Sequence, residues 1–170
     1  MKVKLFFNNI EVEADISEKD YERVMASLKK TGYEKVTKEN PTYYFDNGGG
    51  YVGESLDPYP ETDGNNAYKA ANYYTDKTVA ENNIRADKLM RQLRRFAVEH
   101  RKEQLDWTFG DQSKYYIYYD YGDGVVRVSE NHFFKDLGVV YFDSKETAWE
   151  TATAFADEIV WYFTEHKDSL

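Results

Sequence analysis

A long amphipathic stretch, residues 75–102, most constrains what this chain can fold into. Its apolar side chains recur at the spacing of an α-helix, and Thr75 or Asp76 is placed to cap its start. The apolar side consists of Ala86, Leu89, Met90, Leu93, Phe96 and Ala97. We therefore expect one strong helix near the middle of the chain, with its apolar side packed against other elements.

Three strands and a final helix are predicted after this helix. The strands are expected at about 114–121, 125–132 and 138–143. Gly122-Asp123-Gly124 forms the turn between the first two, and Ser144 caps a helix running to about 166. The apolar side of that last helix is Ala148, Trp149, Ala152, Phe155, Ile159, Val160 and Phe163. This order of elements resembles that of the double-stranded-RNA-binding domain, a likeness of topology alone.

The first half contains shorter elements. Residues 2–15 predict a hairpin, Ser17 caps a helix of about 14 residues, and residues 33–38 predict a third strand. Tyr43-Tyr44-Phe45 and Tyr51-Val52 pair across the run Gly48-Gly49-Gly50. We expect an α+β protein of two sub-domains, or of two halves that share a core. Its parts are an N-terminal ββα(ββ) part at 1–54, a loop or linker at 55–74, and an αβββα part with an antiparallel three-stranded sheet at 75–170.

Composition excludes several kinds of chemistry. The chain has no Cys, which removes disulfides, Cys-ligated zinc, iron–sulfur clusters and thiol catalysis. No 18-residue apolar run is present, and Met1–Phe7 lacks the long apolar region of a signal peptide. The glycine run lacks the Gly-Lys-Ser/Thr of a phosphate loop, and Asp120–Gly124 lacks the ligand spacing of a calcium loop. We expect a soluble, cytoplasmic protein with no membrane partner, metal or cofactor.

Charge is distributed unevenly along the chain. The 170 residues include 31 acidic and 22 basic ones, a net charge of −9. Residues 74–102 carry +4, residues 1–73 carry −4, and residues 103–170 carry −9 with 14 acidic and 5 basic side chains. An acidic chain repels nucleic-acid phosphates except where a basic face dominates locally. The start of the last helix has one Lys and two Glu, which argues against binding duplex RNA there.

The basic face lies on the central helix. Lys88, Arg91, Arg95 and Lys102 fall within roughly 60° of one another by the helical period. They are candidates for contact with nucleic acid, RNA included, or with an acidic protein. The alternatives are a solvated face and an internal partner for the acidic strands and last helix.

An acidic face is predicted on the last helix. Opposite its apolar side lie Glu146, Glu150, Asp157, Trp161, Glu165 and Asp168. An exposed Trp161 among carboxylates is typical of a binding anchor, unless the N-terminal half covers it. The row of carboxylates can imitate a phosphate backbone, or it serves solubility alone. On the first strand of the sheet, Tyr116 and Tyr118 are candidates for a platform that stacks on bases or contacts a protein.

Two histidines are the candidates for catalysis. His132 follows Glu130 closely and can pair with it as an acid and base. His100 lies beside Arg101 and Lys102 at a helix end, where the helix dipole favours a cation in any case. The three His are far apart in sequence and show no metal-ligand spacing. The inventory of a metal-independent ribonuclease is present, without a specific constellation.

Residues 75–166 resemble a module found in small uncharacterised proteins of Gram-positive phages and mobile elements. The resemblance rests on Arg85-Ala86-Asp87, Leu93-Arg94-Arg95-Phe96-Ala97, Asp106-Trp107, Tyr118-Tyr119-Asp120, Gly138–Glu146, Phe155–Ile159 and Tyr162-Phe163. Small acidic proteins of this kind without Cys are similar in character to anti-CRISPR inhibitors. The resemblance implies a non-enzymatic inhibitor whose acidic surface binds a host protein or ribonucleoprotein with a basic surface, with a Cas9-type nuclease as leading partner. The alternatives are a nuclease or processing enzyme acting on guide RNA, and a phage structural or replication-accessory protein.

Overall fold

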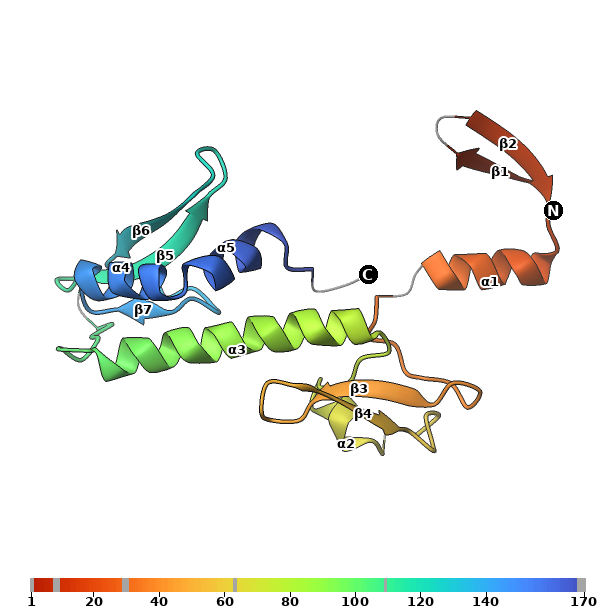
Figure 1. The fold of residues 1–170 in the computed structure, drawn as a ribbon, viewed down its shortest axis with the longest axis horizontal. Helices are drawn as coiled ribbons and strands as arrows, with labels where there is room; N and C mark the ends of the chain where they lie inside the picture. The colour runs from red at the N-terminus through yellow and green to blue at the C-terminus, as the bar shows by residue number, and fades with distance from the viewer. Residues whose placement is uncertain (1, 8–9, 29–30, 63, 109, 168–170) are drawn as a thin grey trace.

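The computed structural model describes residues 2–7, 10–28, 31–62, 64–108 and 110–167, and it is a mixed α+β protein (Figure 1). In chain order its first elements are β1 (Lys2–Phe7), β2 (Ile10–Asp15), α1 (Glu18–Leu28), β3 (Thr42–Asp46), β4 (Val52–Leu56) and α2 (Asn66–Lys69). Those that follow are α3 (Lys77–Glu99), β5 (Lys114–Asp120), β6 (Val125–Asn131), β7 (Tyr141–Phe142), α4 (Lys145–Ala154) and α5 (Ala156–Thr164). The described residues contain no helix of the length and apolar character that a membrane crossing requires.

The predicted central helix is confirmed as α3. Its start is fixed by Asp76, whose Oδ1 accepts hydrogen bonds from the backbone N–H groups of Thr78 at 2.8 Å and Val79 at 3.0 Å. These bonds satisfy donors that have no partner within the first turn of a helix. The buried side chains of α3 recur along one side of it: Val79, Ala80, Ile84, Ala86, Leu89, Leu93 and Ala97. Two successive stretches of this side pack against two different modules.

The first module is the β3–β4 hairpin, which packs on the N-terminal stretch of α3 (Figure 1). The hairpin predicted across the glycine run is confirmed, and its strands pair antiparallel from Thr42↔Leu56 to Asp46↔Val52. Tyr44 and Val52 of the hairpin pack against a buried cluster formed by Tyr74, Val79, Ala80 and Ile84. The hairpin is therefore attached to the same helix that supports the C-terminal half.

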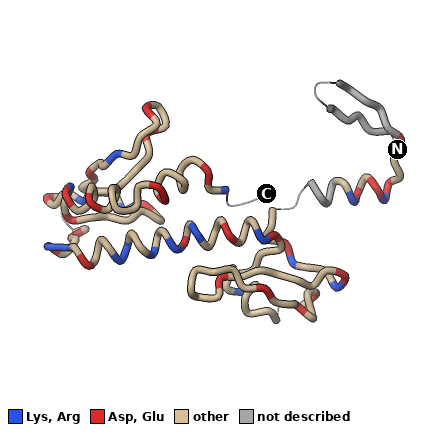
Figure 2. Tube along the Cα trace, in the orientation of Figure 1, with Lys and Arg blue, Asp and Glu red and all other residues tan. Residues whose placement is uncertain are grey.

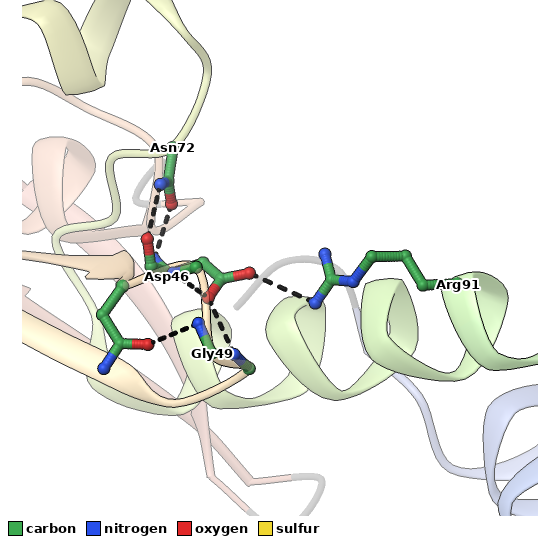
Figure 3. Close-up of polar contacts among 7 residues, drawn as sticks. Asp46, Gly49, Asn72 and Arg91 are labelled. Carbon is green, nitrogen blue, oxygen red and sulfur yellow. Dashed lines mark hydrogen bonds and ion pairs between the residues drawn. The ribbon is translucent and has the colours of Figure 1, made fainter.

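Asp46 holds the glycine-rich turn of this hairpin (Figure 3). Its Oδ1 accepts hydrogen bonds from Gly48 N–H at 2.9 Å and Gly50 N–H at 3.2 Å, and its Oδ2 lies 3.3 Å from Arg91 of α3. Its backbone exchanges two hydrogen bonds with the side chain of Asn72, at 2.6 and 2.9 Å. Gly48 and Gly50 have φ of +86° and +78°, which L side chains rarely adopt and which explains glycine at both positions.

Residues 55–74, predicted as a loop or linker, contribute buried side chains to this module. Tyr73 and Tyr74 are 3% and 6% exposed, and Tyr74 pairs with Tyr44 through two backbone hydrogen bonds. The hydroxyl of Tyr73 donates to the buried carboxylate of Asp57 at 3.3 Å. Burial raises the pKa of the Tyr74 hydroxyl to about 12, with the charges of Tyr33, Asp87 and Asp46 adding to the effect.

The second module is a three-stranded antiparallel sheet covered by helices, as predicted. The strand order is β6-β5-β7, so that β5 lies in the centre. The pairs between β5 and β6 begin at Lys114↔Asn131, and those between β5 and β7 include Tyr116↔Tyr141. One buried cluster joins α3 to α5 through Leu89, Leu93 and Ile159. A second cluster joins α3 to the sheet and α4 through Ala97, Phe142 and Ala148.

Three predicted elements are corrected. Residues 33–38 form no strand; their backbone instead runs over the first module, where Val36 is buried and its N–H donates to the Tyr73 hydroxyl at 3.2 Å. The strand predicted at 138–143 is only two residues long, because β7 pairs with β5 at Tyr141 and Phe142 alone. The last helix does not run unbroken to 166 but divides into α4 and α5 at Phe155, whose φ is −118°.

The β1–β2 hairpin is confirmed, with pairs from Lys2↔Asp15 to Phe7↔Ile10. Its predicted turn at Asn8-Asn9 lies outside the described residues. Ser17 caps α1 as predicted, since its Oγ accepts from Asp20 N–H at 3.1 Å and donates to the Asp20 carboxylate at 2.6 Å. Figure 1 shows β1, β2 and α1 set apart from the two modules on α3.

Candidate binding surfaces

Trp161, predicted as an exposed anchor, is buried with 8% of its surface exposed. The guanidinium of Arg85 on α3 lies 3.8 Å from the centre of its ring, and His166 packs against its edge. Arg85 is held there by Glu158 of α5 through two hydrogen bonds of 2.8 and 2.9 Å. The prediction is therefore wrong for Trp161, and its cover comes from α3 rather than from the N-terminal half.

The Arg85–Glu158 pair shifts the pKa of both groups. The hydrogen bonds from Arg85 lower the pKa of the Glu158 carboxyl, and those same bonds raise the pKa of the Arg85 guanidinium. Both side chains are more than a third exposed, so solvent screens much of their attraction. The pair's role is to fix the guanidinium over Trp161, where cation–π contact and packing close the seam between α3 and α5.

Trp149, predicted on the apolar side, is 43% exposed on α4. The buried side of α4 consists of Thr147, Ala148, Thr151 and Ala152. Trp149 therefore lies on the opposite, solvent side, with Glu146 and Glu150 next to it on the same helix. The sequence predicts Trp149 on the apolar side because it does not reveal that Thr147 and Thr151, rather than the tryptophan, are buried on α4.

Four of the acidic residues that the sequence predicts lie on the solvent-exposed side of α4 and α5. Glu146, Glu150, Asp157 and Glu165 are all exposed, and within the described residues none of them forms an ion pair with Lys, Arg or His. Asp168 lies outside the described residues. We call Glu146, Trp149, Glu150 and Asp157 the acidic face. Figure 2 shows acidic positions along α4 and α5 and basic ones along α3.

The predicted basic strip on α3 is largely occupied by internal contacts. Arg91 pairs with Asp46 at 3.3 Å, and Arg95 pairs with Glu99 of its own helix at 3.1 Å. Lys88 lies 5.9 Å from the ring centre of Tyr51. The backbone N–H of Lys102, rather than its side chain, donates a hydrogen bond to the carboxylate of Asp143. The described side-chain contacts are therefore with β3, with Tyr51 and with α3 itself, and not with the acidic strands or the last helix that the alternative named.

Tyr116 and Tyr118 lie on the face of the sheet opposite the helices. Their rings are 6.1 Å apart, and Tyr116 also contacts Tyr141 of β7 at 5.9 Å. Tyr115 and Ile117, the alternate residues of β5, pack with the α3 and α4 cores. The hydroxyl of Tyr141 donates to Asp136 at 3.0 Å, and burial raises its pKa. Both tyrosines predicted for partner contact are thus half-buried within an aromatic row.

The two candidate catalytic histidines are each held in a local structural contact. His100 stacks on Phe96 with ring centres 3.9 Å apart, and its Nδ1 lies 3.0 Å from the Phe96 carbonyl oxygen. His132 contacts the Gly110 carbonyl oxygen at 3.1 Å, and its Nε2 lies 3.8 Å from Glu130 as the sequence suggests. Over the residues that the structure describes, no three His, Asp or Glu side chains are grouped so as to hold a metal ion.

Comparison with protein-family models, with curated proteins and with solved structures finds no match for this chain.

Proposed function

We propose that this chain is a binding protein of the phage or mobile-element inhibitor type, which docks its acidic face onto a basic surface of a host nucleic-acid-handling complex. The observation that carries the proposal is Trp149, a tryptophan 43% exposed between carboxylates that lack partners in the described structure. Tryptophan is enriched among the residues that dominate binding energy, because it buries a large area on contact. The surrounding charges steer the encounter and orient the complex.

The partner chemistry follows from the sign of this surface. Carboxylates on one face of two successive helices present negative charge where a basic channel expects phosphate groups. A Cas9-type nuclease holds its guide–target duplex in a positively charged channel, and it is the partner we propose first. The resemblance of residues 75–166 to a phage module supports the same choice.

The test is inhibition of target cleavage by a purified Cas9-type nuclease loaded with guide RNA. We expect the wild-type chain to inhibit, and Trp149→Ala combined with Glu150→Lys to weaken inhibition by about 30-fold, since a central aromatic anchor is worth about 2 kcal/mol. Two matched controls lie on other surfaces: Tyr59→Ala removes an aromatic ring that is 66% exposed, and Glu54→Lys reverses an exposed charge on β4. Both controls should inhibit like the wild type.

The outcomes separate the proposal from its alternatives. Full inhibition by the Trp149→Ala/Glu150→Lys variant would contradict the role of the acidic face, and absence of inhibition by the wild type would contradict the nuclease as partner. Labelled guide RNA is followed in the same reactions. Shortened RNA that depends on His100 or His132 would favour an RNA-processing enzyme instead.

A further inference from the structure

A pocket of about 450 Å³ opens at the C-terminal end of α3, on residues outside the acidic face. It lies between the last turns of α3, the segment at 104–107 and the segment at 135–141. Its polar and aromatic lining consists of Arg94, Arg101, Gln104, Trp107, Lys135 and Tyr141. The volume falls within the range of sites that bind small organic molecules.

Three cations line this pocket, and none of the described lining residues is a carboxylate. Within the described residues, the side chains of Arg94 and Arg101 form no hydrogen bond or ion pair, unlike those of Arg85, Arg91, Arg95 and Arg127. The Nε of Arg101 is buried without a hydrogen-bond partner. Burying part of a guanidinium without a partner costs free energy.

The carboxylates near the pocket accept hydrogen bonds within the chain, although Oδ1 of Asp143 is buried without a hydrogen-bond partner. Asp136 accepts a hydrogen bond from the Tyr141 hydroxyl at 3.0 Å, and Asp143 accepts from the backbone N–H groups of Lys102 and Glu103. Asp106 accepts from both the backbone and the hydroxyl of Thr108. In a chain with nine more acidic than basic residues, Arg94 and Arg101 thus form no ion pair within the described residues, and the Nζ of Lys135 lies 5.7 Å from the ring centre of Trp107.

The pocket also offers a surface for a planar ring. Trp107 packs edge-on against Tyr141 with ring centres 4.9 Å apart, and Ala97, Val98 and Val139 add apolar wall. The Trp107 segment is held in place by Gln112, whose Nε2 donates to the Gln104 carbonyl at 3.0 Å and whose Oε1 accepts from Asp106 N–H at 2.7 Å. A ring contact fixed in this way loses little conformational entropy on binding.

We propose that this pocket binds a nucleotide, with its phosphate on Arg94, Arg101 and Lys135 and its base against Trp107 and the apolar wall. Paired guanidinium groups suit phosphate because they donate hydrogen bonds in a fixed, planar geometry. An aromatic side chain stacks on any base, so the pocket selects the nucleotide class rather than one sequence. A free nucleotide and the phosphorylated end of a single strand share this chemistry.

The test is isothermal titration calorimetry of the full chain with four probes: AMP, adenosine, inorganic phosphate and a single-stranded octanucleotide with a 5′ phosphate. We expect AMP to bind more tightly than adenosine or phosphate. Arg101→Gln should weaken AMP binding tenfold or more, because it removes charge-assisted hydrogen bonds. Arg95→Gln is the matched control, since it removes the same charge from the same helix at a residue outside the pocket.

The octanucleotide probe distinguishes a free nucleotide from the phosphorylated end of a single strand. Binding tighter than that of AMP, lost when the 5′ phosphate is removed, identifies the end of a strand, whereas tighter binding of AMP identifies a free nucleotide. The proposal is overturned if AMP does not bind at millimolar concentration, if phosphate binds as tightly as AMP, or if Arg95→Gln and Arg101→Gln weaken AMP binding equally. Far-ultraviolet circular dichroism of each variant confirms that the chain is folded.

Discussion

Trp149 and Trp161 show how packing against neighbouring elements decides the surroundings of a residue. In an unbroken helix, Trp149 falls on the apolar side and Trp161 among the carboxylates. In the structure, α4 buries Thr147 and Thr151 and leaves Trp149 43% exposed, whereas Arg85 of α3 covers Trp161, which is 8% exposed. Periodicity alone predicts neither result, because it treats the threonines as polar and does not show which element covers Trp161.

Tyr74 leads to a prediction about alkaline stability. Its pKa in the folded chain is about 12, mainly because burial disfavours the phenolate, whereas a tyrosine in an unfolded chain ionises near 10. The contribution of the neutral Tyr74 hydroxyl to the free energy of unfolding is therefore complete below pH 10, and it is lost as the pH rises from 10 to 12. We expect the wild-type chain to lose on the order of 2 kcal/mol over this range through Tyr74.

The measurement is urea unfolding at several pH values, compared with Tyr74→Phe. Phenylalanine keeps the ring and removes the ionising group, so the variant should lose less stability between pH 10 and 12. Equal losses in the two proteins would show that Tyr74 does not couple folding to pH.

At the scale of elements, Asp46 adds polar contacts to the apolar packing that attaches the β3–β4 hairpin to α3. Its carboxylate accepts the turn's N–H groups and also meets Arg91, so Asp46→Ala removes both contacts at once. We expect Asp46→Ala to lower the free energy of unfolding by about 2 kcal/mol. Asp46→Asn keeps an acceptor for the turn and loses only a partly exposed ion pair, which costs less than about 1 kcal/mol.

Urea unfolding followed by circular dichroism measures both changes. Glu54→Gln is the control, because it neutralises an exposed carboxylate in the same hairpin. If Asp46→Ala unfolds with the same midpoint as Glu54→Gln, Asp46 does not hold the turn.

The elements that sequence predicts well are those with local signals. α3 has a capping Asp76 and a regular apolar side, and the β3–β4 hairpin has glycines at the positive-φ positions of its turn. Residues 33–38 contain strand-forming side chains but find no strand partner, because the edge of the hairpin pairs with Tyr74 instead. The pocket combines Arg94, Arg101, Trp107 and Lys135 from three segments, so no spacing in the sequence reveals it.

At the scale of the whole molecule, the two modules on α3 form a unit without the N-terminal elements. β1 and β2 pair with each other, and α1 lies apart from the modules in Figure 1. The contacts described between the N-terminal part of the chain and α3 begin at Gly32. Gly32 packs against Val79 of α3, and its carbonyl accepts a hydrogen bond from the N–H of Thr75, just before α3, at 2.8 Å. We expect a chain starting at Thr31 to fold with a thermal midpoint within about 5 °C of the full chain.

Differential scanning calorimetry of the shortened and full chains provides the comparison. A shortened chain that starts at Tyr44, and so lacks Gly32 and the first two residues of β3, serves as the control and should unfold at a clearly lower temperature. Loss of a cooperative transition on removal of residues 1–30 would mean that β1, β2 and α1 support the modules.

The length of α3 also has a geometric consequence. Its 23 residues span about 35 Å, and this helix rather than a flexible tether joins the β3–β4 hairpin to the sheet and α4. The glycine-rich turn lies beside Lys88 and Arg91, so the part of α3 that follows Arg91 sets its position relative to the sheet and α4. A partner that touches both the turn and Trp149 must itself present two sites at a matching separation, and a helical insertion in α3 after Arg91 would both lengthen that separation and rotate one site relative to the other.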